Sequence, residues 1–337
     1  MGDVYGSFVV AAVQAEPVFL DRESTVDKAC ELIAEAGRNG ADLVAFPESF
    51  VPGFPYWPRG ISLHESDASV EAFVRLHQNA VVIPSPSTDQ LAAAACSAQV
   101  DVVMGVTERT TSAGAGLFNT LLYIGHDGEV LGRHRKLVPT WSERCVWGRG
   151  DGSDLFVLDR DGFALSGLIC AENLMTLSKY ALLSMGEQVH VAAWPSFSTM
   201  SDWIQIVCRN YAIEGQVFVI AACGIQTERT VPEDFVLKAD TVWNGNGGSA
   251  IIGPDGSYVI EPVYGREAIL YGEIDLGAIV RAKAVFDTVG HYARPDVARL
   301  LVDHDPQRVW SPLTRPVSAA SSIDSDPEGG LGRVDDH

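Results

Sequence analysis

The residue best suited to covalent chemistry in this sequence is Cys170, which ends the apolar run FALSGLIC. The residues that follow, AENLMTLSKYALL, have the character of a helix. A cysteine where a strand passes into a helix can lie on a sharp turn, with the next backbone N–H groups facing whatever its sulfur attacks. Such a position can also lower the pKa of the thiol. Because a buried cysteine is more often inert, Cys170 needs further support as a nucleophile.

Two other reactive side chains also stand where apolar segments end. Glu48 ends LVAFPE, and Lys136 ends VLGRHRK. A charge at a strand end usually marks only the point where the chain reaches water. A thiol, a carboxylate and an ammonium at three strand ends nevertheless form a coherent set. The carboxylate can take the thiol proton, and the ammonium can stabilise negative charge on the substrate.

Other kinds of catalytic or ligand site find no support in the sequence. GxSxG and HExxH are absent, and the eight histidines form no close pair with metal-ligand spacing. The segment GNGGS (245–249) is not followed by the GK[ST] of a phosphate loop, and we interpret it as a turn entering a strand. The six cysteines are scattered without a CxxC pair, which argues against a disulfide framework and a zinc site. We expect no metal and no organic cofactor, because the protein itself would supply the nucleophile, the base and the group that stabilises negative charge.

The elements that must position these residues alternate between apolar β-rich runs and helical stretches, which predicts an α/β fold. Strands are expected at 8–15, 41–48, 100–108, 189–196, 216–224, 248–260 and 267–275, and helices at 21–38 (beginning near Ser24), 66–81, 87–99, 173–186 and 199–215. Asp-Gly turns predict hairpins at 118–136 and 155–170, so the sheets should be mixed. No linker divides the chain. We expect one domain, residues 1–313, and a disordered polar tail, residues 314–337.

The overall charge limits the partners. The chain has 24 Lys and Arg against 44 Asp and Glu, a net charge of −20, which disfavours nucleic acid and anionic membrane surfaces. No stretch reaches the roughly 18–20 apolar residues that a bilayer span needs. The start of the chain, MGDVYGSFVVAAVQ, lacks a basic region before its apolar run and predicts a first strand rather than a signal peptide. The unpaired cysteines then favour the reducing cytoplasm.

Four segments in order resemble the nitrilase superfamily of carbon–nitrogen hydrolases, and within it the true nitrilase branch. AFPES contains Glu48, GRHRKLVPT contains Lys136, WSERCVWGRGDGSDL contains Glu143 and GLICAEN contains Cys170. The hairpin segments FNTLLYIGHDGEVLG and NGGSAIIGPDGSYV and the segment GHYARPDV (290–297) match as well, so the resemblance covers roughly residues 8–300. One departure is Ala171, where the family usually has tryptophan or glycine.

The resemblance implies a four-layer α-β-β-α sandwich and a catalytic tetrad of Glu48, Lys136, Glu143 and Cys170. Glu48 would be the general base, Lys136 would contact the developing anion, and Glu143 would position groups and manage protons. Spacing alone would have left Glu143 as a surface acid. Glu172 is expected to anchor the turn. The implied reaction converts a nitrile to the carboxylic acid and ammonia through a thioimidate and a thioester on Cys170, in a homo-oligomer built from dimers.

Aromatic residues near strand ends can line an apolar substrate cleft. The candidates for substrate binding are Phe54, Trp57, Trp141, Ala171 and Trp194. Each aromatic residue taken singly is more often core packing, and position in the family favours Trp57 and Trp194. The small Ala171 is expected to change the shape of the pocket. Apolar aliphatic or aromatic nitriles would suit such a site.

Two alternatives stay open at this point. An amidase, a carbamoylase or a cyanide-hydrolysing enzyme of the same superfamily would use the same four residues, although WGRGDGS and GHYARPDV favour nitriles. A non-catalytic scaffold that kept the fold would be expected to have lost at least one of the four, and all four are present.

Overall fold

A computed structural model describes residues 4–59, 67–111 and 114–307. One compact unit spans Met1–Pro306, and the description below concerns that unit. The predicted tail, residues 314–337, and the domain boundary before it lie outside the described residues, so both stay predictions.

The first sheet contains six strands within the described residues, in the order β13-β1-β2-β3-β4-β5. Their bounds are β1 Ser7–Gln14, β2 Leu43–Ala45, β3 Asp101–Arg109, β4 Leu117–Ile124, β5 Val130–Arg135 and β13 Ala268–Asp275. Strands β1, β2 and β3 are parallel, whereas β13, β4 and β5 pair antiparallel with their neighbours. The predicted hairpin at 118–136 forms β4 and β5.

The second sheet is also mixed, as predicted. In the described part of the chain its path is β10-β11-β9-β8-β7-β6, with β12 paired to β11. Strands β7, β8 and β9 are parallel, and the others are antiparallel. The bounds are β6 Leu158–Arg160, β7 Phe163–Ile169, β8 Val189–Trp194, β9 Phe218–Cys223, β10 Ile225–Gln226, β11 Gly245–Ile252 and β12 Tyr258–Tyr264.

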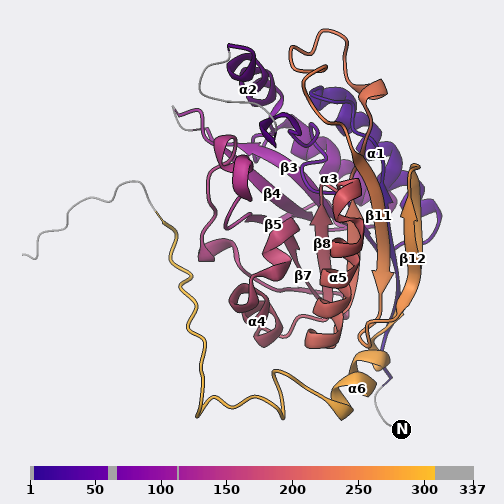
Figure 1. The fold of residues 1–337 in the computed structure, drawn as a ribbon. Coiled ribbons are helices and arrows are strands. Elements are labelled where there is room, and N and C mark those ends of the chain that lie inside the picture. Colours follow the sequence, from indigo (N-terminus) through magenta and orange to yellow (C-terminus); the bar gives the residue numbers. More distant parts are fainter. Residues whose placement is uncertain (1–3, 60–66, 112–113, 308–337) are drawn as a thin grey trace, which may run out of the picture. The chain divides into compact units, whose positions relative to one another are not determined.

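Helices cover the outer faces of both sheets (Figure 1). Helices α1 (Arg22–Arg38) and α3 (Pro86–Ala98) pack on the first sheet, and α4 (Thr176–Ser184) and α5 (Ser201–Gly215) on the second. The remaining α-helices are α2 (Asp67–Asn79) and α6 (Leu276–Val285). The fold is thus the predicted four-layer α-β-β-α sandwich. None of the described helices has the length and apolar character to cross a bilayer.

Strand β1 shows why the strand sequences are nearly continuous apolar runs. Val10 and Ala12 join the core between the two sheets, whereas Ala11 and Val13 pack under helix α1. A strand buried on both faces has no face that points to water, so the alternation of polar and apolar residues typical of half-buried strands is lost. Each large apolar side chain buried in this way contributes roughly 1.5–3 kcal/mol to folding.

The structure differs from the sequence predictions mainly at element ends. Helix α1 begins at Arg22 because the side chain of Asp21 accepts a hydrogen bond from the backbone N–H of Ser24. Strand β2 ends at Ala45, before Pro47, which has no N–H to donate to a sheet. Helix α6 was not predicted from the sequence.

The segment GNGGS was predicted to be a turn entering a strand, and it already forms the first residues of strand β11. Gly247 and Gly248 have positive φ values of 79° and 107°, which lets the strand pass closely over Gln14 of β1. Gln14 accepts hydrogen bonds from the backbone N–H groups of Gly248 and Ser249. A Cβ atom at Gly247 would lie 2.4 Å from the Gln14 side chain, so glycine here serves the close contact between the two sheets.

Candidate active site

Three predicted catalytic residues follow strands whose carboxyl ends meet at one edge of the sandwich. Glu48 follows β2, Lys136 directly follows β5, and Cys170 directly follows β7. Because β4 is antiparallel to both β3 and β5, strand β5 runs in the direction of β2. Residues at the carboxyl ends of strands running the same way lie on the same side of a sheet.

The four predicted catalytic residues are brought together in the structure. The Lys136 Nζ atom lies 2.7 Å from Glu48 Oε1 and 2.7 Å from Glu143 Oε2. One carboxylate oxygen each of Glu48 and Glu143 and the Cys170 sulfur all lie within 4.8 Å of one another. All four residues are buried, and Cys170 is 3% exposed. A thiol, two carboxylates and an ammonium therefore share one small space shielded from water.

A glycine in the neighbouring strand makes room for the Glu48 turn. A Cβ atom at Gly105 of β3 would lie 1.9 Å from the carbonyl oxygen of Pro47. Ser49 has a positive φ of 50°, and its hydroxyl lies 2.7 Å from that of Thr107. The chain is therefore pulled tightly against β3 directly beside Glu48.

Cys170 lies on the sharp turn that the sequence predicts. Its φ is 55°, a left-handed conformation that is strained in a residue with a side chain, and residues Cys170–Leu174 form the short 3₁₀ helix η4 rather than the first turn of α4. The carbonyl oxygen of Cys170 accepts a 2.9 Å hydrogen bond from the side-chain amide of Asn173. This buried amide helps to hold the turn.

Glu172 anchors the turn, as expected from the sequence. Its two oxygens accept hydrogen bonds from the backbone N–H groups of Ile169 (2.9 Å) and Leu137 (2.6 Å). One carboxylate thus ties the segment carrying Cys170 to the segment that follows Lys136.

His134 forms a buried ion pair with the same carboxylate. Its Nε2 lies 3.1 Å from Glu172 Oε2, and its Nδ1 lies 3.1 Å from the carbonyl oxygen of Asp154. Both partners can only accept, so both ring nitrogens must carry hydrogen, and His134 is an imidazolium. Burial works against this charge, but Glu172 and Asp154 raise the pKa of His134 above its ordinary value. Burial alone would raise the pKa of Glu172. The His134 imidazolium and the backbone N–H donors outweigh burial and lower it.

Burial raises the pKa values of both the carboxylate of Glu48 and the thiol of Cys170. Burial raises the pKa of Glu48 to about 7, although Lys136 opposes this rise. Burial also raises the pKa of the Cys170 thiol well above its ordinary value, against the effect of the Lys136 ammonium. Burial works against the ammonium itself, but Glu48, Cys170 and Glu143 raise the pKa of Lys136. The resting site therefore holds a neutral thiol beside a carboxylate that titrates near neutral pH.

Glu48, Glu143 and Cys170 are close enough together to ligate one metal ion. The ammonium of Lys136, however, already lies between the two carboxylates at hydrogen-bonding distance from each. It supplies the positive charge that a metal would bring, so the donor set is better suited to the Lys136 ammonium than to a metal ion.

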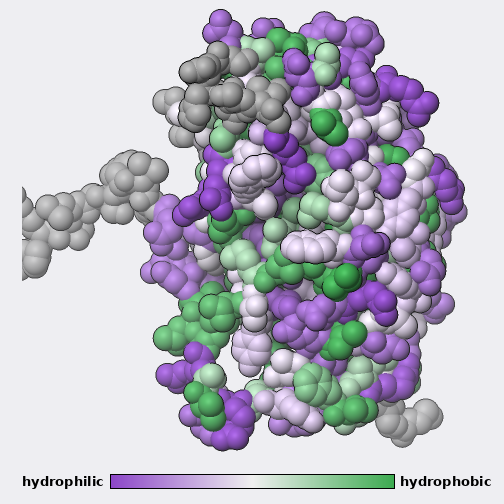
Figure 2. Space-filling view, in the orientation of Figure 1, coloured by the Kyte–Doolittle hydropathy of each residue, from purple (hydrophilic) through white to green (hydrophobic). Residues whose placement is uncertain are grey.

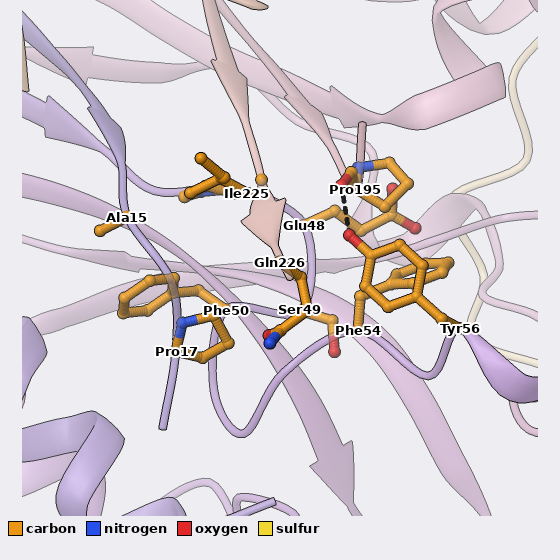
Figure 3. A pocket seen from close by; sticks show the side chains of 12 residues that line it. Ala15, Pro17, Glu48, Ser49, Phe50, Phe54, Tyr56, Pro195, Ile225 and Gln226 are labelled. Atoms are coloured by element: carbon orange, nitrogen blue, oxygen red, sulfur yellow. Dashed lines mark hydrogen bonds between the residues drawn. The ribbon is translucent and has the colours of Figure 1, made fainter. Parts of the chain in front are cut away.

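A narrow cavity of about 10 Å³, room for about one water molecule, reaches Glu48. In Figure 3 the Tyr56 ring lies beside Pro195, and the Tyr56 hydroxyl donates a 2.8 Å hydrogen bond to the Pro195 carbonyl. Phe54, a predicted substrate-binding residue, lines this cavity. Cys170 is not one of the residues that line this cavity.

The other predicted substrate-binding residues take different positions. Trp57 lies in a buried aromatic cluster, where its ring is 5.4 Å from that of Phe235. Trp194 is buried at the end of β8, and Ala171 is half-buried next to Cys170. Trp141, at the start of the 3₁₀ helix η2 (Trp141–Cys145) that carries Glu143, is 72% exposed. None of these four lines the narrow cavity.

Sequence reasoning missed two polar residues of the site. Asn119 of β4 donates a 2.6 Å hydrogen bond to Glu48, and Asn173 holds the cysteine turn. The signal that could have identified Asn119 is its place in the apolar strand FNTLLYI, because a buried amide must find hydrogen-bond partners.

The chain matches known proteins along most of its length. The sequence profile of the family described as carbon-nitrogen hydrolase matches residues 9–284. The chain belongs to the carbon–nitrogen hydrolase family. It is similar to an aliphatic nitrilase of Rhodococcus rhodochrous, with 42% identity over 94% of this chain and 88% of that protein. It is also similar to a nitrilase of Bacillus sp. (strain OxB-1), with 37% identity over 89% of each. This confirms the predicted branch of the family.

Solved structures of this superfamily share the fold. A Saccharomyces cerevisiae protein from branch 10 of the nitrilase superfamily aligns with a TM-score of 0.70 at 18% identity, over 86% of this chain and 97% of that chain. A mutant of the Nesterenkonia AN1 amidase aligns with a TM-score of 0.62 at 19% identity, over 83% of this chain and 96% of that chain. At such low identity these similarities speak for the sandwich alone.

Proposed function

We propose that this chain hydrolyses nitriles to the carboxylic acid and ammonia, with Cys170 as the nucleophile. The observation that carries the proposal is the buried Lys136 ammonium, 2.7 Å from both Glu48 and Glu143, with the Cys170 sulfur close to both carboxylates. The named nitrilases that resemble this chain over most of its length support the choice of a nitrile.

In the first half of the reaction the carbon–sulfur bond forms. Glu48 takes the proton of the Cys170 thiol as the sulfur adds to the nitrile carbon, and the proton passes to the nitrile nitrogen. Lys136 stabilises the negative charge that develops on that nitrogen. The product is a covalent thioimidate.

In the second half two water molecules are consumed. The first adds to the thioimidate carbon, and the tetrahedral intermediate expels ammonia to leave a thioester. The second hydrolyses the thioester, releasing the acid and restoring the thiol. We assign Glu143 a supporting role, because one of its oxygens is held by Lys136 while Oε1 has no hydrogen-bond partner among the described residues. The free oxygen is suited to orient water or to accept a proton.

The substrate is proposed to be an apolar aliphatic or aromatic nitrile. Phe54 contributes an apolar wall beside Glu48, with its ring 5.0 Å from that of Tyr56. Trp57, Trp141, Ala171 and Trp194 are proposed to shape the rest of the pocket. The small cavity next to Glu48 implies that these groups rearrange when a substrate larger than one water enters.

The active form is proposed to be a homo-oligomer built from dimers, in the cytoplasm. Helices α4 and α5 support the assembly, because Leu177, Trp203 and Ile206 leave more than half of their surface exposed. Figure 2 shows hydrophobic residues on the face where these helices lie. Exposed apolar patches of this kind often mark protein contacts. The free cysteines support the compartment.

The proposal is tested by assaying a nitrile panel, the matching amides and cyanide, with acid and amide products measured separately. We expect ammonia and acid from nitriles. Cys170→Ala should abolish turnover, whereas the matched Cys96→Ala, at an exposed cysteine, should retain it. Turnover of the amides or of cyanide alone would assign another activity of the superfamily. Full nitrile turnover by Cys170→Ala would disprove the nucleophile.

A further inference from the structure

The carboxylate of Glu48 is held by a neutral side chain as well as by Lys136. Asn119 lies in strand β4, is fully buried, and donates from Nδ2 to Glu48 Oε1 at 2.6 Å. The Lys136 Nζ atom donates to the same oxygen at 2.7 Å. The second oxygen, Glu48 Oε2, is buried and has no hydrogen-bond partner among the described residues. The two oxygens of one carboxylate therefore have different environments.

We propose that Asn119 is a positioning residue that fixes the Glu48 carboxylate so that Oε2 takes the thiol proton. The inference rests on the proposed role of Glu48 as the base for Cys170. Two donors occupy Oε1, whereas Oε2 keeps its lone pairs free for a proton. A carboxylate held by Lys136 alone could rotate about its terminal torsion and present either oxygen.

The backbone of the same residue also positions Lys136. The carbonyl oxygen of Asn119 accepts a 2.8 Å hydrogen bond from the backbone N–H of Lys136. Asn119 thus contacts the base through its side chain and the lysine through its main chain. Its amide orientation follows from chemistry, because an amide oxygen facing the carboxylate would be repelled.

Of the charged or titratable groups around Glu48, only Lys136 also donates a hydrogen bond to its carboxylate within the described part of the chain. Lys136 lies at the end of β5, Glu143 in η2 and Cys170 in η4, and the Tyr56 hydroxyl is engaged with Pro195. Glu143 raises the pKa of Glu48, whereas Lys136 and the hydrogen bond from Asn119 lower it. Loss of the Asn119 donor should therefore leave Glu48 protonated over a wider range of pH.

The test uses Asn119→Leu, which keeps the side-chain shape and removes the donor. The matched control is Thr120→Val, which removes a buried hydrogen bond to Glu108 from the next residue of β4. The rate of iodoacetamide labelling of Cys170 is measured from pH 5 to 9 on the full chain, together with kcat/KM for a nitrile. Labelling needs the base and the thiol but no turnover, so it remains readable in a variant that has lost catalysis.

The labelling rate should fall as pH drops and Glu48 is protonated; we call this part of the pH profile the acidic limb. In Asn119→Leu we expect the acidic limb to move up by about one pH unit, which slows labelling roughly tenfold at pH 6. Thr120→Val should keep the limb of the unaltered protein. An unmoved limb in Asn119→Leu, or an equal movement in Thr120→Val, would overturn the inference. If the unaltered protein hydrolysed no nitrile but the limb moved as expected, the proposed substrate would fail and the role of Asn119 would stand.

Asn119→Asp provides a second variant in case the leucine disturbs folding. It has almost the same shape but places a second carboxyl group against Glu48, so the two groups would share a proton. Its acidic limb should move at least as far as that of Asn119→Leu. A limb at or below that of the unaltered protein would count against Asn119 as the group that holds Oε1.

Discussion

The side-chain amide of Asn173 donates a 2.9 Å hydrogen bond to the carbonyl oxygen of Cys170, the residue with the left-handed backbone. The other end of the amide is also fixed, since Asn173 Oδ1 lies 2.8 Å from His190 Nε2. His190 Nδ1 in turn lies 2.6 Å from Glu187 Oε1. A fully buried chain of three side chains thus ends on the backbone of Cys170, the proposed nucleophile.

Asn173→Asp should weaken this support without changing the size of the side chain. A carboxylate cannot donate to the Cys170 carbonyl, so a buried acceptor loses its partner, at a cost of about 1–3 kcal/mol in the free energy of unfolding. A displaced sulfur should lower kcat by about 10²-fold. Urea unfolding and steady-state kinetics measure both effects. His190→Gln, which keeps a donor, should retain more activity than His190→Phe. Equal losses in the two variants would contradict a role for the hydrogen-bonded chain of Glu187, His190 and Asn173 in holding the Cys170 turn.

The raised pKa of Glu48 predicts the pH dependence of activity. Only the carboxylate form can accept the thiol proton, so kcat/KM should fall as pH drops below about 7, by about tenfold per pH unit. Glu48→Gln should lose at least about 10²-fold at every pH. The check is a profile of kcat/KM from pH 5 to 9. A limb near the ordinary glutamate value of 4.5 would mean that burial does not control this group.

Lys136→Met should destabilise the protein in a pH-dependent way. Without the ammonium, two buried carboxylates face each other, and loss of one partner from a buried ion pair costs about 3–5 kcal/mol. The pKa of Glu48, which burial already raises against the effect of Lys136, would then rise further in the folded state. Groups raised in this way contribute stability below their unfolded pKa and lose it as pH rises through the folded pKa. The loss should therefore be larger at pH 8 than at pH 5.5, measured by urea unfolding.

Lys179→Met is the matched control for that variant. Lys179 is also buried, but its partner Glu214 is partly exposed to water. A carboxylate that can be hydrated tolerates loss of its partner, so this variant should lose less stability. An equal loss in the two variants, or a Lys136→Met loss independent of pH, would contradict the account.

The local signals of the sequence predict the strands, the hairpins and the mixed sheets, whereas the four-layer sandwich was implied by the family resemblance. Asp-Gly turns set the hairpins, and runs such as FVVAAVQA mark strands buried on both faces. Element ends were less accurate, because they depend on single contacts such as the Asp21 cap. The sequence of helix α6 does not show a clear helical pattern of apolar residues, so the helix was not predicted. The glycines of 245–249 fit a strand only because Gln14 packs against them.

The tetrad was partly visible from strand ends, and the residues that support it were not. Glu48, Lys136 and Cys170 each end an apolar run, but Glu143 lies in a loop and needed the family resemblance. Asn119 contacts Glu48 across 71 positions of sequence. No local pattern reports such a pairing, since it arises from the order of strands in the sheet. A single buried amide in an apolar strand is the only sign that the sequence offers.

Glu172→Gln should reveal whether the buried pair of His134 and Glu172 is ionised. The wild-type pair is ionised when Glu172 has lost its proton and His134 has kept its own. Because the pKa of Glu172 is lowered on folding, its contribution to stability is lost as pH falls through the folded value. Because the pKa of His134 is raised, its contribution is present below about 6.5 and is lost as pH rises through the folded value.

The difference in unfolding free energy between wild type and Glu172→Gln should therefore be largest near pH 6, at about 3–5 kcal/mol, and should shrink toward pH 9. Some loss should persist at all pH values, because the glutamine amide can accept only one of the two backbone hydrogen bonds from Ile169 and Leu137. Urea unfolding at pH 6, 7.5 and 9 measures the difference. A constant difference across this range would show that His134 is neutral and that Glu172 acts only as a backbone acceptor.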